Sequence, residues 1–474
     1  MTDQNYDLVV IGSGPAGQKA AINAVKLGKR AAVIERDGMV GGASVHSGTI
    51  PSKTLRHAVL YVTGFNERAF YGRDYHLREQ ISREEIASRV RMIVTRETHL
   101  VQAQFSRNGV AELHGTAQFL DPHTLQITGT SGTTTVRGDY ILIACGTRPA
   151  RSRSVPVDGQ RIVDTDQLAA RLLSELPQEA PAVSGMPREI IIVGGGIIGL
   201  EYASMCAALE IRVTLIEERP QILDFVDREI VEALSYHLRE LEVIFRLGEK
   251  VVAVESDENQ NRVIARLESG KTVHGDSLLY SVGRQGNTDT LNLTAAGLEA
   301  DARGRLKVNE FFQTAAPHIY AAGDVIGFPA LAATSMEQGR LAAAHMFGAA
   351  FKHEVDLLPY GIYTIPEIAM IGQTEEQLTA QRIPYESGVA RYEEIAKAEM
   401  LGDQTGMLKL LFHPDTRKLL GIHAIGQRAT EIVHIGQTAL AFGGTVEYFR
   451  DAVFNYPTLA EAYKVAALNG LNKV

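Results

Sequence analysis

The sequence predicts an α/β protein in which two copies of a strand–helix–strand fold precede a smaller α+β domain. Two observations predict the duplication: a glycine-rich turn follows an apolar strand at residues 7–17, and the same arrangement recurs at residues 189–199. From about residue 351 the sequence predicts alternating apolar strands and an Ala-rich helix near the C-terminus. This part of the chain contains no glycine-rich turn of this kind. At roughly 100–200 residues per domain, 474 residues fit about three domains.

The first glycine-rich turn has the features of a Rossmann-like dinucleotide-binding site. An apolar strand ends at Gly12, Gly14 and Gly17, and a helix and a second apolar strand follow. Glycines at this spacing let the backbone approach a pyrophosphate, which the N–H groups at the helix N-terminus bind. Glu35 ends the second strand, 23 residues after Gly12, where an acid accepts hydrogen bonds from an adenosine ribose. We therefore expect a bound dinucleotide here.

The second turn repeats this pattern and predicts a second dinucleotide. Its glycines are Gly194, Gly196 and Gly199, and its acid is Glu217, again 23 residues after the first glycine. Two such folds in one chain are typical of enzymes with one resident and one exchanging dinucleotide. Glu217 favours NAD(H), because a carboxylate repels the 2′-phosphate of NADP(H). Two interpretations of Arg219 stay open: it pairs with that phosphate, or it is a solvated surface charge.

Composition and charge exclude several function classes. The 56 acidic and 47 basic residues give a net charge of -9 without basic blocks, so we expect no nucleic-acid partner. The N-terminus lacks a signal-peptide pattern and no apolar run is long enough to span a membrane, so we expect a cytoplasmic protein with no membrane partner. The two cysteines, Cys145 and Cys206, lie 61 positions apart without metal-ligand spacing, so we expect no metal site.

Three segments outside the two turns are interpreted from local pattern. Residues 141–146 (ILIACG) predict a strand that ends in a turn of small residues. Residues 151–187 are rich in Pro, Ser and Glu near their end, which predicts a loop or hinge. Residues 319–322 predict a short strand that ends at Gly323 and Asp324.

These motifs together resemble those of the flavoprotein disulfide reductase family, the group of glutathione reductase and lipoamide dehydrogenase. The resemblance runs along the whole chain and rests on Gly12–Glu35, Gly41-Gly42, Ile50–Lys53, Ala144–Gly146, Gly194–Glu217, Val282–Arg284, Gly323-Asp324 and Thr364–Glu367. It implies one non-covalent FAD per subunit, NAD(H) and NADP(H) as substrates, and a homodimer or larger homo-oligomer. The implied domains are 1–150 and 281–350 for FAD, 151–280 for NAD(P) and 351–474 for dimerisation.

The resemblance also implies roles for individual residues. In that family, residues matching Asp324 hydrogen-bond the ribityl–phosphate part of the flavin. Lys53 corresponds to a lysine near the flavin N5 edge, ion-paired with the glutamate that matches Glu201. The alternative is an ordinary surface Lys–Glu pair. Further cofactor-binding positions implied by the matching motifs are Gly42, Gly146 and Gly283.

The departures from the family pattern bear on the chemistry. The family carries a C-x-x-x-x-C redox pair where this chain has Ser44 and Thr49, and a hydroxyl forms no disulfide. The family also carries a C-terminal histidine where this chain has Tyr456, although Glu461 is retained. A phenol with an ordinary pKa of about 10 is a poor proton shuttle at neutral pH. Both losses exclude disulfide reduction.

One branch of the family lacks this dithiol chemistry and exchanges hydride between pyridine nucleotides. The chain resembles it at Gly48–Lys53, Gly283–Thr288 and Phe454–Tyr463. The resemblance implies an FAD-dependent, ping-pong NAD(P)+ transhydrogenase (NADPH + NAD+ = NADP+ + NADH), with Lys53, Glu201 and Thr49 as catalytic residues. Thr49 either hydrogen-bonds the flavin or only fills the space of the lost sulfur. The alternatives are an NAD(P)H diaphorase or quinone reductase, and a non-catalytic flavin-binding protein.

Overall fold

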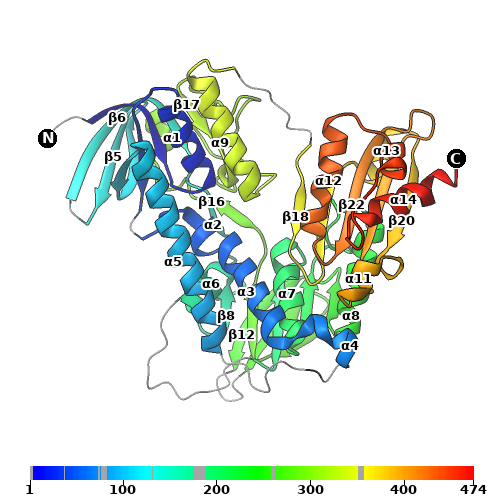
Figure 1. The fold of residues 1–474 in the computed structure, drawn as a ribbon. Helices are drawn as coiled ribbons and strands as arrows, with labels where there is room; N and C mark the ends of the chain where they lie inside the picture. Colours follow the sequence, from blue (N-terminus) through cyan, green and yellow to red (C-terminus); the bar gives the residue numbers. More distant parts are fainter. Residues whose placement is uncertain are drawn as a thin grey trace.

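The structure is a computed structural model that describes residues 4–36, 38–72, 75, 83–130, 132–173, 187–257, 262–350 and 357–474. Its elements form three groups around three main sheets (Figure 1). The first group combines strands β1 to β6 with β17, which comes much later in the chain. The second group is built from the strands between them, and the third from the C-terminal part of the chain. The confirmed fold class is α/β, with two Rossmann-like folds and a C-terminal α+β domain.

The first sheet follows the order β3-β2-β1-β6-β5-β4, and β17 pairs with β6. Strands β3, β2, β1, β6 and β17 are parallel, whereas β4 and β5 extend the sheet as an antiparallel hairpin. The second half of strand β1, from Leu8 to Ile11, is buried and apolar, as expected for a parallel strand covered on both faces. The bounds are β1 (Gln4–Ile11), α1 (Pro15–Lys26), β2 (Ala31–Glu35), β3 (Ala111–His114), β4 (Thr116–Asp121), β5 (Thr124–Gly129), β6 (Gly132–Ile143), β17 (Ile319–Ala321) and α9 (Ala332–Met346).

The second sheet follows the order β11-β10-β9-β15-β8 and is parallel throughout. A separate antiparallel sheet, β12-β13-β14, belongs to the same group. The bounds are β8 (Ile162–Asp164), α6 (Thr165–Leu173), β9 (Glu189–Val193), α7 (Ile197–Ala208), β10 (Arg212–Glu217), α8 (Arg228–Glu240), β11 (Ile244–Leu247), β12 (Val251–Asp257), β13 (Arg262–Leu267), β14 (Thr272–Gly275) and β15 (Ser277–Tyr280).

The third sheet is antiparallel, in the order β18-β19-β22-β21-β20. Helices α12 and α14 pack on it around a core that includes Phe412, Phe449 and Tyr463. The bounds are β18 (Tyr360–Ile362), β19 (Glu367–Gly372), α10 (Glu375–Gln381), β20 (Glu386–Arg391), η4 (Tyr392–Glu394), α11 (Ala396–Met400), β21 (Met407–Phe412), β22 (Leu419–Gly426), α12 (Ala429–Ala441), α13 (Val446–Asp451) and α14 (Glu461–Leu471).

The remaining elements connect these groups. Helices α3 and α5 pack against each other and reach from the first group towards the second (Figure 1). Strands β7 and β16 form a two-stranded antiparallel link between the groups. The bounds are α2 (Gly42–His46), α3 (Thr49–Thr63), η1 (Phe65–Glu67), α4 (Arg68–Tyr71), α5 (Arg83–Asn108), β7 (Thr147–Pro149), β16 (Arg284–Gly286), η2 (Leu293–Ala296) and η3 (Asp324–Ile326).

The interpretation of residues 151–187 as a loop or hinge was wrong for its middle part. Strand β8 adds to the edge of the second sheet beside β15, and helix α6 follows directly. Ile162 is 1% exposed, because it packs into the core of that sheet. The Pro- and Glu-rich part, residues 174–186, lies outside the described residues. Within the described ranges, no helix is long and apolar enough to cross a membrane, and no cluster of three metal-ligating side chains is found.

Candidate functional site

A cavity of about 970 Å³ lies where the three groups of elements meet. Its volume is at the upper end of the range for ligand sites, about 300–1,000 Å³. It brings together eleven of the predicted site residues: Gly12, Gly14, Glu35, Gly42, Thr49, Lys53, Gly146, Gly196, Glu201, Gly283 and Asp324. The other four do not line it: Gly17, Gly194, Gly199 and Glu217.

The first glycine-rich turn is held tightly between β1 and α1. Gly12 has φ +105°, and a Cβ there would lie 2.4 Å from the carbonyl oxygen of Ala144. A Cβ at Gly17 would lie 2.0 Å from the carbonyl oxygen of Gly12. At Gly14, the residue before α1, a Cβ would meet nothing within 4 Å, so this glycine leaves open space at the helix N-terminus. The turn can therefore accept a phosphate group at that end.

The carboxylate of Glu35 is bound to the turn. Its Oε2 accepts hydrogen bonds from the backbone N–H of Ser13, at 2.7 Å, and from the Ser13 hydroxyl, at 2.6 Å. Its Oε1 accepts one from the N–H of Arg36 at 2.9 Å. These contacts fix the acid at the end of β2, beside the cavity.

The second turn repeats the geometry of the first. Gly194 has φ +109°, and a Cβ at Gly199 would lie 1.9 Å from the Gly194 carbonyl oxygen. Gly196, like Gly14, has nothing within 4 Å of an added Cβ. Helix α7 begins at the next residue, so the open space again lies at a helix N-terminus.

Glu217 ends β10 and is bound to its turn as Glu35 is. Its Oε2 accepts the N–H of Gly195 at 2.6 Å, and its Oε1 accepts the N–H of Arg219 at 2.9 Å and Arg219 Nε at 3.0 Å. Burial disfavours the charged form of this 8%-exposed residue, but these hydrogen bonds outweigh burial and hold the pKa of Glu217 below its ordinary value.

Lys53 and Glu201 both line the cavity and form an ion pair with each other. Lys53 Nζ donates to Glu201 Oε1 at 2.8 Å and to Oε2 at 2.7 Å. The Glu201 side chain is only 5% exposed, and its Oε1 also accepts the N–H of Tyr363 at 2.9 Å. Lys53 Nζ lies 4.8 Å from the centre of the Tyr363 ring. The pair joins α3, α7 and the start of the C-terminal domain, so it is no ordinary surface pair.

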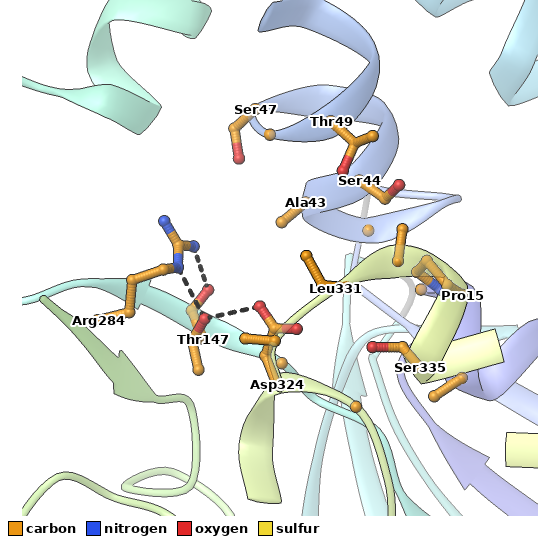
Figure 2. A pocket seen from close by; sticks show the side chains of 18 of the residues that line it. Pro15, Ala43, Ser44, Ser47, Thr49, Thr147, Arg284, Asp324, Leu331 and Ser335 are labelled. Carbon is orange, nitrogen blue, oxygen red and sulfur yellow. Dashed lines mark hydrogen bonds between the residues drawn. The ribbon is translucent and has the colours of Figure 1, made fainter. Parts of the chain in front are cut away.

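Asp324 lies on the opposite side of the cavity from α2 and α3 (Figure 2). Its Oδ2 accepts a hydrogen bond from the Thr147 hydroxyl at 3.3 Å. Arg284 donates to that hydroxyl and to the Thr147 carbonyl oxygen, both at 2.8 Å. Burial raises the pKa of Asp324 above its ordinary value, although the charge of Arg284 and the Thr147 hydroxyl oppose this.

Hydroxyls occupy the segment where the family pattern has sulfur. Ser44 on α2, Ser47 after it and Thr49 at the start of α3 line the same wall of the cavity (Figure 2). Cys145 lines the cavity elsewhere, two residues after the end of β6, and Cys206 lies on α7. Burial raises the pKa of each thiol to about 12.

The C-terminal pair does not take part in this cavity. The Tyr456 residue is 69% exposed and does not line the cavity. Glu461 Oε2 is buried and has no hydrogen-bond partner among the described residues.

Comparison with known proteins identifies the family. The sequence profile described as "Pyridine nucleotide-disulphide oxidoreductase" matches residues 6–339, and the profile of that family's dimerisation domain matches residues 358–467. The chain belongs to the pyridine nucleotide-disulphide oxidoreductase family. This confirms the resemblance, and with it an FAD-dependent oxidoreductase that uses pyridine nucleotides.

Named members of this family cover nearly the whole chain. Proteins from Mycobacterium tuberculosis and Mycobacterium bovis called soluble pyridine nucleotide transhydrogenase are 51% identical over 99% of this chain and 98% of their own. A protein of the same name from Klebsiella pneumoniae is 46% identical over 99% of both chains. Among solved structures, LpdA from Mycobacterium tuberculosis superimposes with a TM-score of 0.88 at 26% identity, over 98% of this chain and 99% of that one.

Three residues of the site were missed by the sequence motifs. Ser13 binds Glu35, Thr147 connects Asp324 with Arg284, and Tyr363 covers Lys53. Ser13 lies inside the first glycine-rich turn, so its position within that motif was the available signal. The contacts of Thr147 and Tyr363 gave no such signal, because their partners lie more than 130 residues away along the chain.

Proposed function

We propose that this chain transfers hydride from NADPH to NAD+ through FAD, giving NADP+ and NADH. FAD, when bound, supplies a carrier that takes a hydride from one pyridine nucleotide and gives it to another. The proposal rests on the Lys53–Glu201 ion pair, which the family places beside the flavin. The neighbouring segment has hydroxyl side chains, Ser44 and Thr49, where the family has its redox-active cysteine pair. The names of the relatives at 46–51% identity support the same function.

The residues of the cavity fit FAD. The open space beside Gly14 suits a pyrophosphate, and Glu35 is fixed where an adenosine ribose would lie. Gly42 has φ +62°, and a Cβ there would lie 2.9 Å from Gly14 Cα, so the two chain segments close tightly around this end. Asp324 would hold the ribityl–phosphate part, which offsets the cost of keeping this carboxylate in a buried place.

Lys53 would stabilise the negative charge that develops near it during hydride transfer. Both oxygens of Glu201 bind its ammonium group, and the Tyr363 ring lies against it, so its position is set before coenzyme binds. A preorganised charge of this kind needs no reorientation when charge develops, and this lowers the barrier. Thr49 would face the flavin from α3, either as a hydrogen-bonding group or as a filler.

The thiols would take no part. With pKa values of about 12, Cys145 and Cys206 stay protonated at neutral pH, and a protonated thiol is a poor nucleophile. Electrons that enter from one nucleotide would then leave only to a second nucleotide. Because the chain has one NAD(P) turn, at Gly194–Gly199, the two nucleotides would use that site in succession, which is a ping-pong scheme.

Initial-rate kinetics test this function. NADPH and thio-NAD+ are varied against each other on the FAD-loaded enzyme, and thio-NADH is followed. We expect thio-NADH to form and the double-reciprocal plots to be parallel. Intersecting lines would contradict the ping-pong scheme, and the absence of thio-NADH would contradict transhydrogenation.

A diaphorase is the second candidate. The carboxylate of Glu217 is held at the second turn by backbone N–H groups, and an acid at this position favours NADH over NADPH. This preference supports an enzyme that oxidises NADH with a quinone or dye. Reduction of a quinone by NADH at a rate far above transhydrogenation would favour this candidate.

Domain limits, assembly and location are also proposed. We propose domain boundaries near residues 150, 280 and 350. Two observations support them: β6 and β17 belong to the same first sheet, and the strands between them, β8 to β15, build the second group. The match to a dimerisation domain supports a homodimer or larger homo-oligomer. A cytoplasmic location stays a prediction.

A further inference from the structure

Three charged side chains form a row at the end of β10. Arg219 lies in the middle: its Nε donates to Glu217 Oε1 at 3.0 Å, and its Nη1 donates to Asp224 Oδ1 at 3.2 Å. Burial changes along the row, because the side chains of Glu217, Arg219 and Asp224 are 9%, 45% and 55% exposed. The row therefore runs from the buried acid of the turn to solvent.

The two acids in this row differ in how firmly they are held. Glu217 accepts three N–H groups, two of them from the backbone of Gly195 and Arg219, and this fixes it in place. Asp224 has Arg219 as its only ion-pair partner among the described residues. Arg219 Nη2 has no hydrogen-bond partner in the same part of the chain. One guanidinium nitrogen thus stays available, but its direction is set by Asp224.

A 2′-phosphate placed beside Glu217 would experience opposed forces. It carries about two negative charges near pH 7, so both acids repel it, and the guanidinium of Arg219 attracts it. Arg219 can pair well with the phosphate only by giving up part of its contact with an acid. The contact with Asp224 is the exposed one and therefore the easier to exchange. A ribose 2′-hydroxyl makes no such demand.

We propose that Asp224 is a specificity-determining residue that sets the balance between NADP(H) and NAD(H) by holding Arg219. This inference rests on the proposed function only in placing the adenosine ribose of the exchanging nucleotide beside Glu217. In the NAD(H) complex, Arg219 keeps both acids as partners. In the NADP(H) complex, Arg219 exchanges Asp224 for the 2′-phosphate. The arrangement admits both coenzymes while making the phosphate compete for its arginine.

The test uses fragments that need no hydride transfer, so that it is independent of transhydrogenation. Binding of 2′,5′-ADP and of ADP to the FAD-loaded enzyme is measured by calorimetry for wild type and Asp224→Asn. We expect the variant to bind 2′,5′-ADP about three- to tenfold more tightly, as removal of one exposed charge allows, and ADP within about twofold of wild type. The gain should shrink at about 1 M salt, where the Debye length is about 3 Å.

Two further variants separate specificity from general structure. In an Arg219→Gln background, Asp224→Asn should lose most of its selective effect, because Asp224 acts through Arg219. Glu232→Gln, which removes the acid of the exposed Arg228–Glu232 pair on α8, should change neither affinity. Equal changes for both fragments, or an undiminished effect of Asp224→Asn in the Arg219→Gln background, would overturn the proposal. So would a wild-type enzyme that binds neither fragment.

Discussion

Lys53 Nζ lies within 2.8 Å of both carboxylate oxygens of Glu201, 148 residues away along the chain. Lysine comes from α3, in the connection between the glycine-rich folds, and glutamate from α7, directly after the second turn. The contact therefore ties the helix that follows the first glycine-rich fold to the first helix of the second fold. Because Glu201 is buried, the pair is also a place where loss of one partner leaves an uncompensated charge.

Loss of the ammonium group at this pair should slow hydride transfer. For Lys53→Met we expect flavin reduction by NADPH to fall about 10²-fold, the usual effect of losing one preorganised electrostatic group. Glu201→Gln, which still accepts a hydrogen bond, should have a smaller effect. Stopped-flow absorbance of the FAD-loaded variants measures both rates. Lys250→Met, at an exposed pair with Glu218, is the control and should react as wild type does. An unchanged rate in Lys53→Met would remove the lysine from the mechanism.

The second turn allows packing and ligand approach to be separated. Gly199→Ala should cost about 1–3 kcal/mol of unfolding free energy, because its Cβ would lie 1.9 Å from a backbone oxygen. Gly196→Ala, whose Cβ meets no protein atom within 4 Å, should change stability by about 0.5 kcal/mol at most but weaken NADH binding. Urea unfolding and NADH titration check the two effects. Equal losses of unfolding free energy in both variants would show that Gly196 has a structural role and not a role in ligand approach.

A cysteine-free enzyme should retain its activity. In Cys145→Ala/Cys206→Ala, transhydrogenation should stay within about twofold of wild type, and its pH profile between pH 6 and 9 should be unchanged, because thiols with pKa values of about 12 do not ionise there. Iodoacetamide should leave the folded wild-type enzyme active. Abolished activity with FAD still bound would mean that a thiol takes part.

A buried charge cluster joins the second group to the C-terminal domain. Lys409 is 2% exposed and pairs with Asp227 at 3.0 Å, Glu229 at 3.1 Å and Glu375 at 2.9 Å. Lys409→Met should cost about 3–5 kcal/mol of unfolding free energy, because Asp227 is then buried without a counter-ion. Arg228→Ala, at an exposed pair, should cost about 0–1 kcal/mol. Denaturant unfolding measures the unfolding free energy of both variants, and equal losses would contradict this prediction.

The pH dependence of this contribution follows from Lys409. Burial disfavours its ammonium form, but hydrogen bonds and the charges of Glu375 and Asp227 outweigh burial and hold the pKa of Lys409 above its ordinary value. A lysine whose pKa is raised by folding contributes its full stabilisation below the unfolded-state pKa of about 10.4. This stabilisation is lost as pH rises from that value through the folded-state pKa. The stability difference between wild type and Lys409→Met, measured in urea, should therefore be constant from pH 7 to 9 and shrink above about pH 10.4.

The sequence predicted the parts of the fold that local pattern specifies. Both glycine turns, their flanking strands and the final acids lie where their spacing placed them, because each motif requires a particular backbone. Strand β8 was missed, because three residues between polar neighbours carry too short an apolar pattern. It is a strand only because β15 offers it a partner at the sheet edge.

The site was predictable where one motif contains it and not where distant segments meet. Glu35 and Glu217 follow from spacing within a single fold. The Lys53–Glu201 pair followed only from family resemblance, and Tyr363 against Lys53 could not be predicted, since nothing in the local sequence brings α3, α7 and β18 together. The row Glu217–Arg219–Asp224 likewise became visible only with side chains in place.

A single-turnover experiment tests the central claim most directly. FAD-loaded enzyme is reduced anaerobically with one equivalent of NADPH and then mixed with NAD+ while flavin absorbance and NADH are followed. We expect the oxidised flavin spectrum to return at a rate no slower than steady-state turnover, with one NADH formed per flavin. Return of that spectrum only on addition of a quinone or oxygen, with no NADH formed, would contradict transhydrogenation.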